Sequence, residues 1–195
     1  MSCKQLVPVL LAALCLWASA PASAAVPTTT LKIAMGDPES SEMGVVGNAF
    51  KQYVEEKTNG AVQIVCIYGS TPGDDESERF RKVQKGTLDM ALGGIANIVP
   101  LEKKLGILTL PYLFDNLNEV VSGTNGAPAE LLNTYATKAG FRVLTWTYSG
   151  FRFMSNDKHP ITKLEDMKGL RFRVPQSAVM VATYKAFGAI PSLIP

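Results

Sequence analysis

Hydrophobic and polar residues alternate along this chain with two different periods. From Val62 to Tyr68, apolar side chains occupy every second position, which is the period of a β-strand with one buried face. From Ser41 to Val54 they recur at helical spacing, and Asn59–Gly60 supplies a stop. Strand and helix patterns of this kind follow one another along the chain. They predict an α/β fold with largely parallel sheets.

The remaining elements are expected from the same two patterns. Further strands are expected at residues 31–35, 88–92, 107–111 (ending at Pro111), 141–147, 151–155 and 170–174. Further helices are expected at residues 73–85, after Pro100, at 118–121 and 129–138, after a capping box at 162–165, and from Ser177 to about Phe187. In such folds ligands bind beyond the carboxyl ends of the strands, often between domains.

The first 24 residues have the features of an export signal. Lys4 supplies a positive charge, residues 6–17 form an apolar run, and Ala22-Ser23-Ala24 gives a small-x-small cleavage pattern. The run is too short to span a bilayer. We therefore predict a signal peptide at 1–24, a periplasmic mature protein that starts near Ala25, and no membrane span in that mature chain.

Charge and composition argue against several classes of function. Without residues 1–24 the chain keeps 18 basic and 17 acidic residues, so neither a nucleic-acid surface nor a polybasic membrane arm is expected. Cys66 is the one cysteine outside the leader, at an alternating strand position that favours a buried thiol. With His159 as the single histidine, neither a zinc site nor a Ser-His-Asp arrangement is predicted. No metal, cofactor or catalysis is expected.

Two arginines stand among apolar and aromatic residues, where an ordinary solubilising charge is costly to bury. Arg152 lies within Gly150-Phe-Arg-Phe-Met154, and Arg173 within Leu170-Arg-Phe-Arg-Val-Pro175. A guanidinium keeps its proton, so it needs an anionic partner or water. Its planar fork of donors matches a carboxylate two bonds at a time. These positions are therefore candidates to hold an organic acid.

Periodicity alone leaves these assignments open. In the strand 170–174, Arg171 and Arg173 share the face opposite the core, and Pro175 places Arg173 at the carboxyl end. Both could instead be surface charges that pair with nearby acids, and Arg152 could be a structural arginine that bridges strand ends. Tyr148 is either an interdomain core residue or an aromatic wall for a ligand.

Several blocks of the sequence occur in an order and spacing that resemble one known family. They are Gly73-Asp-Asp75, Val83-Gln-Lys-Gly-Thr-Leu-Asp-Met-Ala-Leu92, Leu110-Pro-Tyr-Leu-Phe114, Gly150-Phe-Arg152 and Lys168-Gly-Leu-Arg-Phe-Arg-Val-Pro175. Together they resemble the DctP-type solute-binding subunits of tripartite ATP-independent periplasmic (TRAP) transporters. The likeness runs from about Leu31 to the last residue.

The resemblance implies a periplasmic-binding-protein-like clamp of two α/β domains, type II-like, of which this chain is the N-terminal portion. Domain I is expected at 25–147 and an incomplete domain II at 148–195, because family members continue into further strands. In the family, the arginine at the position of Arg173 bonds the ligand carboxylate with both donors of its fork. The arginine at the position of Arg152 adds further contacts.

The ligand class follows from a departure within this resemblance. Sialic-acid-type members use polar ligand contacts where this chain has Gly36 and Gly94. The resemblance therefore implies a dicarboxylate, keto acid or sugar acid, delivered to the membrane permease of a TRAP transporter. Gly94 is otherwise read as a turn. The alternatives are a sensory binding protein that presents its ligand to a receptor, a hydrolytic enzyme, which the missing nucleophile–base pair argues against, and an inactive truncated fragment.

Overall fold

The computed structural model describes residues 28–69 and 75–194. The predicted signal peptide, the Gly73-Asp74 start of the second predicted helix and Pro195 lie outside the described residues. Among the described helices, each is too short or too polar to cross a lipid bilayer.

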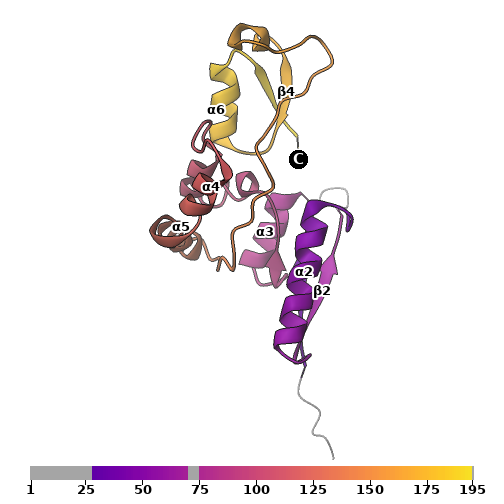
Figure 1. Cartoon of the computed structure of the whole chain (residues 1–195). Coiled ribbons are helices and arrows are strands. Elements are labelled where there is room, and N and C mark those ends of the chain that lie inside the picture. The colour runs from indigo at the N-terminus through magenta and orange to yellow at the C-terminus, as the bar shows by residue number, and fades with distance from the viewer. Residues whose placement is uncertain (1–27, 70–74, 195) are drawn as a thin grey trace, which may run out of the picture.

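The first sheet contains three parallel strands around a central one. β1 (Thr29–Ala34) lies between β2 (Val62–Ile67) and the short β3 (Met90–Ala91). Ile33 pairs in register with Cys66 on one side and Met90 on the other. α2 (Glu42–Lys57) connects β1 to β2 and runs beside β2, as Figure 1 shows. Its Phe50 and Val54 pack on the buried Ile33, Met35 and Ile64.

Short helices follow the first sheet. They are α3 (Glu76–Gln84), the 3-10 helices η1 (Ile95–Asn97) and η2 (Lys103–Thr109), α4 (Leu117–Gly123) and α5 (Gly126–Lys138). A second apolar cluster joins all of these except α4, with Leu105 and Ala136 fully buried within it. Phe80 of α3 packs edge-on against Phe141, with 6.3 Å between ring centroids. This cluster fixes the position of α3 relative to α5.

A second, two-stranded sheet forms the far end of the chain (Figure 1). β4 (Arg171–Val174) pairs in parallel with β5 (Ile190–Leu193). η3 (Leu164–Met167) precedes β4, and α6 (Ala178–Ala186) connects β4 to β5. Phe172, Val174 and Tyr184 form its core. Ala96 of η1 packs into this same cluster, which joins the second sheet to the helices that follow the first.

Much of the predicted element order is confirmed. The α/β class and the parallel pairing are as expected, and Ser41, Asp75 and Ser177 cap α2, α3 and α6 through their side-chain oxygens. The strand expected at 88–92 is present but reduced to Met90–Ala91. The division into two domains, at residues 25–147 and 148–195, remains a prediction.

The strand predicted from residue 107 to Pro111 is wrong. These residues instead belong to η2 and the turn that follows it. The Glu102 carboxylate accepts from the backbone N–H of Lys104 at 2.9 Å, so the chain enters a helical turn before Ile107. That turn buries Leu105 completely, while Ile107 is 50% exposed. Leu105, just before the apolar run, is the residue that packs into the second apolar cluster, and the helical turn places it there.

The strands predicted at 141–147 and 151–155 are also wrong. Both segments lack regular structure, although their residues favour strands. A strand needs a neighbour to accept and donate its backbone hydrogen bonds, and no described strand pairs with either segment. Phe141, Val143 and Trp146 still pack on the second apolar cluster, which accounts for the apolar pattern.

Two local features differ from expectation near the second sheet. β5 was not predicted, because Pro191 interrupts its apolar run. Proline is tolerated there because β5 lies at the edge of its sheet. The predicted capping box places Glu165 as the acceptor, but the structure has Asp166 in that role. The Asp166 carboxylate accepts from the backbone N–H and the hydroxyl of Thr162 at 2.9 Å each. It also accepts from the backbone N–H of Lys163 at 3.2 Å.

Two glycines of α2 should differ in their tolerance of alanine. A Cβ at Gly44 would collide with the backbone carbonyl of Glu39, which cannot move without displacing the helix start. A Cβ at Gly47 would meet only the flexible end of Met35, at 2.5 Å. We expect Gly44→Ala to lower the free energy of unfolding by about 1–3 kcal/mol. Gly47→Ala should change it by less than about 1 kcal/mol, because alanine favours the helix. Urea denaturation measures both, and equal losses would contradict the packing described.

The carboxyl of Asp166 should titrate below its ordinary range. Hydrogen bonds from the backbone and side chain of Thr162 stabilise the carboxylate and lower the pKa of Asp166. Since the folded pKa is depressed, the stabilisation is present above the unfolded pKa and is lost as pH falls through the folded value. An NMR titration of the Asp166 carboxyl measures this. Thr162→Val, which removes the hydroxyl donor, should raise the pKa, and an unchanged value would refute the assigned cause.

Candidate functional site

The carboxyl ends of β1 and β3 form one edge of the first sheet. The backbone N–H of Leu92 donates to Ala34 at 2.9 Å, so the two strands leave the sheet side by side. Gly36 follows β1 and Gly94 follows β3, and both are half-buried at this edge. The structure therefore brings these two predicted lining residues to the same end of the sheet, where an α/β fold opens its ligand cleft.

Glu76 holds the loop after β3 in place. Its Oε2 accepts from the backbone N–H of Gly94 at 3.0 Å and from the side-chain amide of Asn97. The buried hydroxyl of Ser77 donates to the carbonyl of Asn97 at 2.8 Å. A Cβ at Gly93 would lie 3.1 Å from the Glu76 carboxylate, so this backbone approaches α3 closely. The Gly93–Gly94 pair therefore allows close contact with α3, in addition to the turn expected from the sequence.

The loop after β4 connects to the same helix. Gln176 donates from its side-chain amide to Oδ2 of Asp75 at 3.4 Å, across 101 positions of sequence. The other oxygen of Asp75 caps α3 by accepting from the backbone N–H of Glu78 at 2.7 Å. The N-terminus of α3 is thus tied both to the edge of the first sheet and to the chain that leaves the second. Neither Glu76 nor this contact could be read from a local pattern, because the partners are far apart in sequence.

Arg173 lies on the exposed face of β4. Phe172 and Val174 point into the core, and Arg171 and Arg173 point away from it, which confirms the predicted alternation. In register, Arg173 pairs with Ser192 of β5. Within residues 28–69 and 75–194, no hydrogen bond or ion pair engages its guanidinium. The alternative of a surface charge held by Glu165 or Asp166 therefore has no contact that supports it.

Arg152 lies in the irregular segment after α5, rather than within the strand predicted at 151–155. It is exposed, and no described residue forms an ion pair with it. Tyr148 is 39% exposed and stacks edge-on with Phe151 at 5.8 Å between ring centroids. The structure records no contact that joins Arg152 or Tyr148 to Arg173. It therefore does not gather the predicted residues into one closed pocket.

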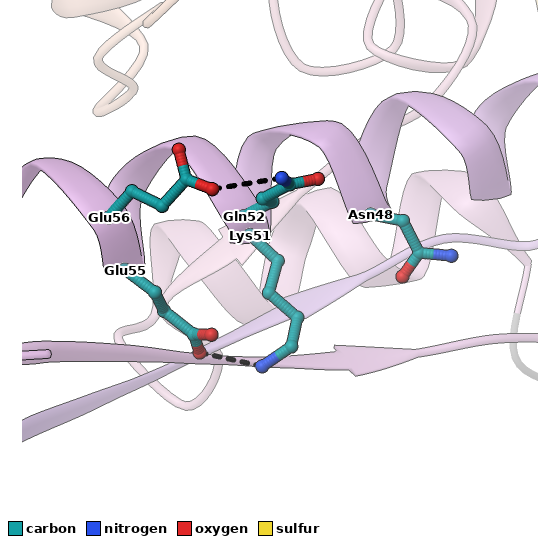
Figure 2. A pocket seen from close by; sticks show the side chains of 5 residues that line it. All are labelled: Asn48, Lys51, Gln52, Glu55 and Glu56. Atoms are coloured by element: carbon teal, nitrogen blue, oxygen red, sulfur yellow. Dashed lines mark hydrogen bonds and ion pairs between the residues drawn. The ribbon is translucent and has the colours of Figure 1, made fainter.

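Two surface depressions lie elsewhere. One is a polar face of α2 (Figure 2), lined by Asn48, Lys51, Gln52, Glu55 and Glu56. Lys51 lies 2.6 Å from Glu55 and also donates to the carbonyl of Ile64. Its hydrogen bond, together with that from the Ile64 backbone, lowers the pKa of Glu55. These polar groups satisfy one another, as expected of a solvated helix face.

The second depression follows the loop from Met154 to Ile161. It is built around Asn156, whose side-chain oxygen accepts from the backbone of Lys158 and His159. In the described part of the chain, no group of three His, Cys, Asp or Glu side chains is placed to hold a metal ion. Cys66 is a free, partly buried thiol that contacts the carbonyl of Gly47 at 3.6 Å.

A comparison with known protein families assigns the chain. The model of bacterial extracellular solute-binding protein, family 7 (DctP), matches residues 33–195. The chain belongs to this family. It is a family of binding proteins, which confirms the prediction of a binding protein rather than an enzyme. The TRAP-type resemblance is confirmed with it.

Individual relatives of the DctP family agree. A solute-binding protein of Verminephrobacter eiseniae is 33% identical over 165 residues, which are 83% of this chain and 48% of the relative. A second relative is a TRAP periplasmic solute-binding protein from Polaromonas sp. JS666, whose crystal structure contains bound D-erythronate. Its sequence is 30% identical, and the structures match with a TM-score of 0.80 over 85% of this chain and 55% of that one. A TRAP protein of Sulfurospirillum deleyianum with bound succinate is 26% identical, with a TM-score of 0.78 over 85% and 53%. The chain spans about half the length of these relatives.

Glu76 should contribute more to stability than Glu78, which is also partly buried on α3. Glu76→Ala removes the acceptor for Gly94 and Asn97, so we expect the free energy of unfolding to fall by about 1–3 kcal/mol. Glu78→Ala is the matched control, because Glu78 forms only a 3.5 Å surface pair with Arg81 and should cost about 0.5 kcal/mol or less. Chemical denaturation compares the two. Similar losses would show that the Glu76 network does not hold the loop.

Proposed function

We propose that this DctP-family chain forms the part of a TRAP solute-binding protein that binds a small organic acid through Arg173. The observation that carries the proposal is an arginine without a protein partner at the carboxyl end of β4. Exposed on its strand, this guanidinium keeps all its donors available for an anion. The ligands of the two crystallised relatives, D-erythronate and succinate, are both carboxylates.

The chemistry of arginine fits this role better than that of lysine. Its two parallel N–H bonds fix the orientation of a carboxylate as well as its position. Because the backbone at a strand end is already ordered, less conformational entropy is lost when the side chain binds the ligand. Arg152 would add a second cationic anchor, with Gly36, Gly94 and Tyr148 lining the cleft. Closure of that cleft would exclude water and strengthen the bonds.

The substrate class and the pathway belong to the same proposal. Gly36 and Gly94 offer no polar side chain at the edge of the first sheet, which favours a dicarboxylate, keto acid or sugar acid. The bound acid would be passed in the periplasm to the TRAP membrane permease. The near-neutral charge of the chain is compatible with a transient contact of this kind.

Two arginines on one face of β4 give a matched test. Arg173→Ala should weaken binding of D-erythronate or succinate by about ten- to a hundredfold, because a charge-assisted pair is lost. Arg171→Ala, on the same exposed face but further from the strand end, should change affinity by less than about twofold. Isothermal titration calorimetry on the wild-type chain and both variants measures the difference.

Arg173→Lys separates the contribution of the bidentate hydrogen-bond geometry to affinity from the contribution of the positive charge. It keeps the positive charge but loses the bidentate geometry, so most of the affinity should still be lost. Equal, small losses for the Arg171 and Arg173 variants would overturn the assignment of Arg173.

A further inference from the structure

The carboxylate of Glu76 has one oxygen that is hydrogen-bonded and one that is available. Oε2 accepts from the backbone N–H of Gly94 at 3.0 Å and from the side-chain amide of Asn97. Among the described residues, none donates a hydrogen bond to Oε1, and no salt bridge involves Glu76. Because the bonds to Oε2 fix the side chain, Glu76 presents a positioned acceptor with unused hydrogen-bonding capacity.

This carboxylate borders the space next to Gly94, which the sequence predicts as a lining residue of the cleft. A Cβ at Gly94 would lie 3.6 Å from Oε2 of Glu76 and 3.6 Å from the amide nitrogen of Asn97. Since glycine has no side chain, Gly94 leaves that space open. The edge of the first sheet therefore has an acidic acceptor, although neither Gly36 nor Gly94 supplies one.

The start of α3 is also hydrogen-bonded to the chain that follows Arg173. Asp75, the residue before Glu76, accepts from the side-chain amide of Gln176 at 3.4 Å. Gln176 comes three residues after Arg173. One hydrogen bond thus joins the neighbour of Glu76 to the turn that begins at the end of β4, and short stretches of backbone connect it to both charged groups.

A cation on one side of a site and a carboxylate on the other distinguish between classes of organic acid. Arg173 attracts a carboxylate, whereas Glu76 accepts from a hydroxyl group and repels a second carboxylate. We propose that Glu76 makes the site selective for hydroxylated monocarboxylic acids over dicarboxylates, by accepting a hydrogen bond from a ligand hydroxyl at Oε1. This inference rests on the proposed binding of the acid by Arg173 and narrows the class of ligand.

Three four-carbon acids separate these requirements on the full chain. D-erythronate has one carboxylate and several hydroxyls, succinate has a second carboxylate, and butyrate has neither addition. A site that accepts from a hydroxyl discriminates against an analogue that lacks it. Isothermal titration calorimetry should therefore rank affinity in the order D-erythronate, butyrate, succinate, with about tenfold or more between the first and the last.

Glu76→Gln changes the available atom from an acceptor to a donor. The amide oxygen still accepts from Gly94 and Asn97, so the melting temperature should stay close to that of the wild-type chain. The amide nitrogen replaces Oε1 and the negative charge is removed. D-erythronate should then bind about three- to tenfold more weakly, and succinate about threefold or more tightly. Butyrate should change by less than about twofold, because it uses neither interaction.

Glu78→Gln is the matched control on the same helix. It removes a charge that pairs with Arg81 at 3.5 Å, so the ratio of the D-erythronate and succinate affinities should change by less than about twofold. The role of Glu76 would be overturned if the wild-type chain bound succinate as tightly as D-erythronate. A ratio that Glu76→Gln leaves unchanged would overturn it as well.

Arg173→Ala separates this inference from the function on which it rests. It should weaken the binding of all three acids without changing their order, because each contains the carboxylate that Arg173 is proposed to bind. Unchanged affinities in this variant would overturn the assignment of Arg173. Absence of binding of all three acids by the wild-type chain would overturn both assignments.

Discussion

Parallel pairing around β1 is the constraint from which the rest of the structure follows. Because β1 runs in the same direction as both of its neighbours, each return of the chain must cross the sheet outside it, and α2 and α3 make these crossings. The same pairing sends the chain out of β1 and β3 at one edge, which brings Gly36 and Gly94 together. The meeting of these two loops at one edge is a consequence of strand direction before any side chain is chosen.

Side chains at the N-terminus of α3 hold two loops of the chain in position. Asp75 and Glu76 are adjacent in sequence, yet they accept hydrogen bonds from different segments of the chain: Asp75 from Gln176 beyond β4, and Glu76 from Gly94 beyond β3. Acidic groups at a helix start are favoured by the free N–H groups and the helix dipole. These carboxylates therefore stabilise their own helix while they position two loops, and the loop after β4 starts two residues beyond Arg173.

Local patterns predicted what depends on local chemistry. Ser41 and Ser177 cap helices because a hydroxyl satisfies the first free N–H groups, and Phe172 and Arg173 alternate because a strand has a period of two. The prediction failed at residues 141–155, since a strand pattern describes a preference and a strand also requires a neighbour. For the site, the sequence indicated the two glycines and Arg173, but the Glu76–Asn97 contact joins positions 21 apart and leaves no periodic signal.

The absence of backbone pairing at 142–155 also bears on the lifetime of the chain. Proteases bind their substrates as extended strands and need free main-chain groups to do so. Arg142 and Arg152, both exposed, offer two cleavage points to an enzyme with trypsin-like preference. A cut at either one would break the backbone between the helices that follow the first sheet and β4, and only side-chain contacts such as the Ala96 packing and the Gln176–Asp75 hydrogen bond would still join the two parts. The exposed connection between the two sheets is therefore a point where proteolysis can begin.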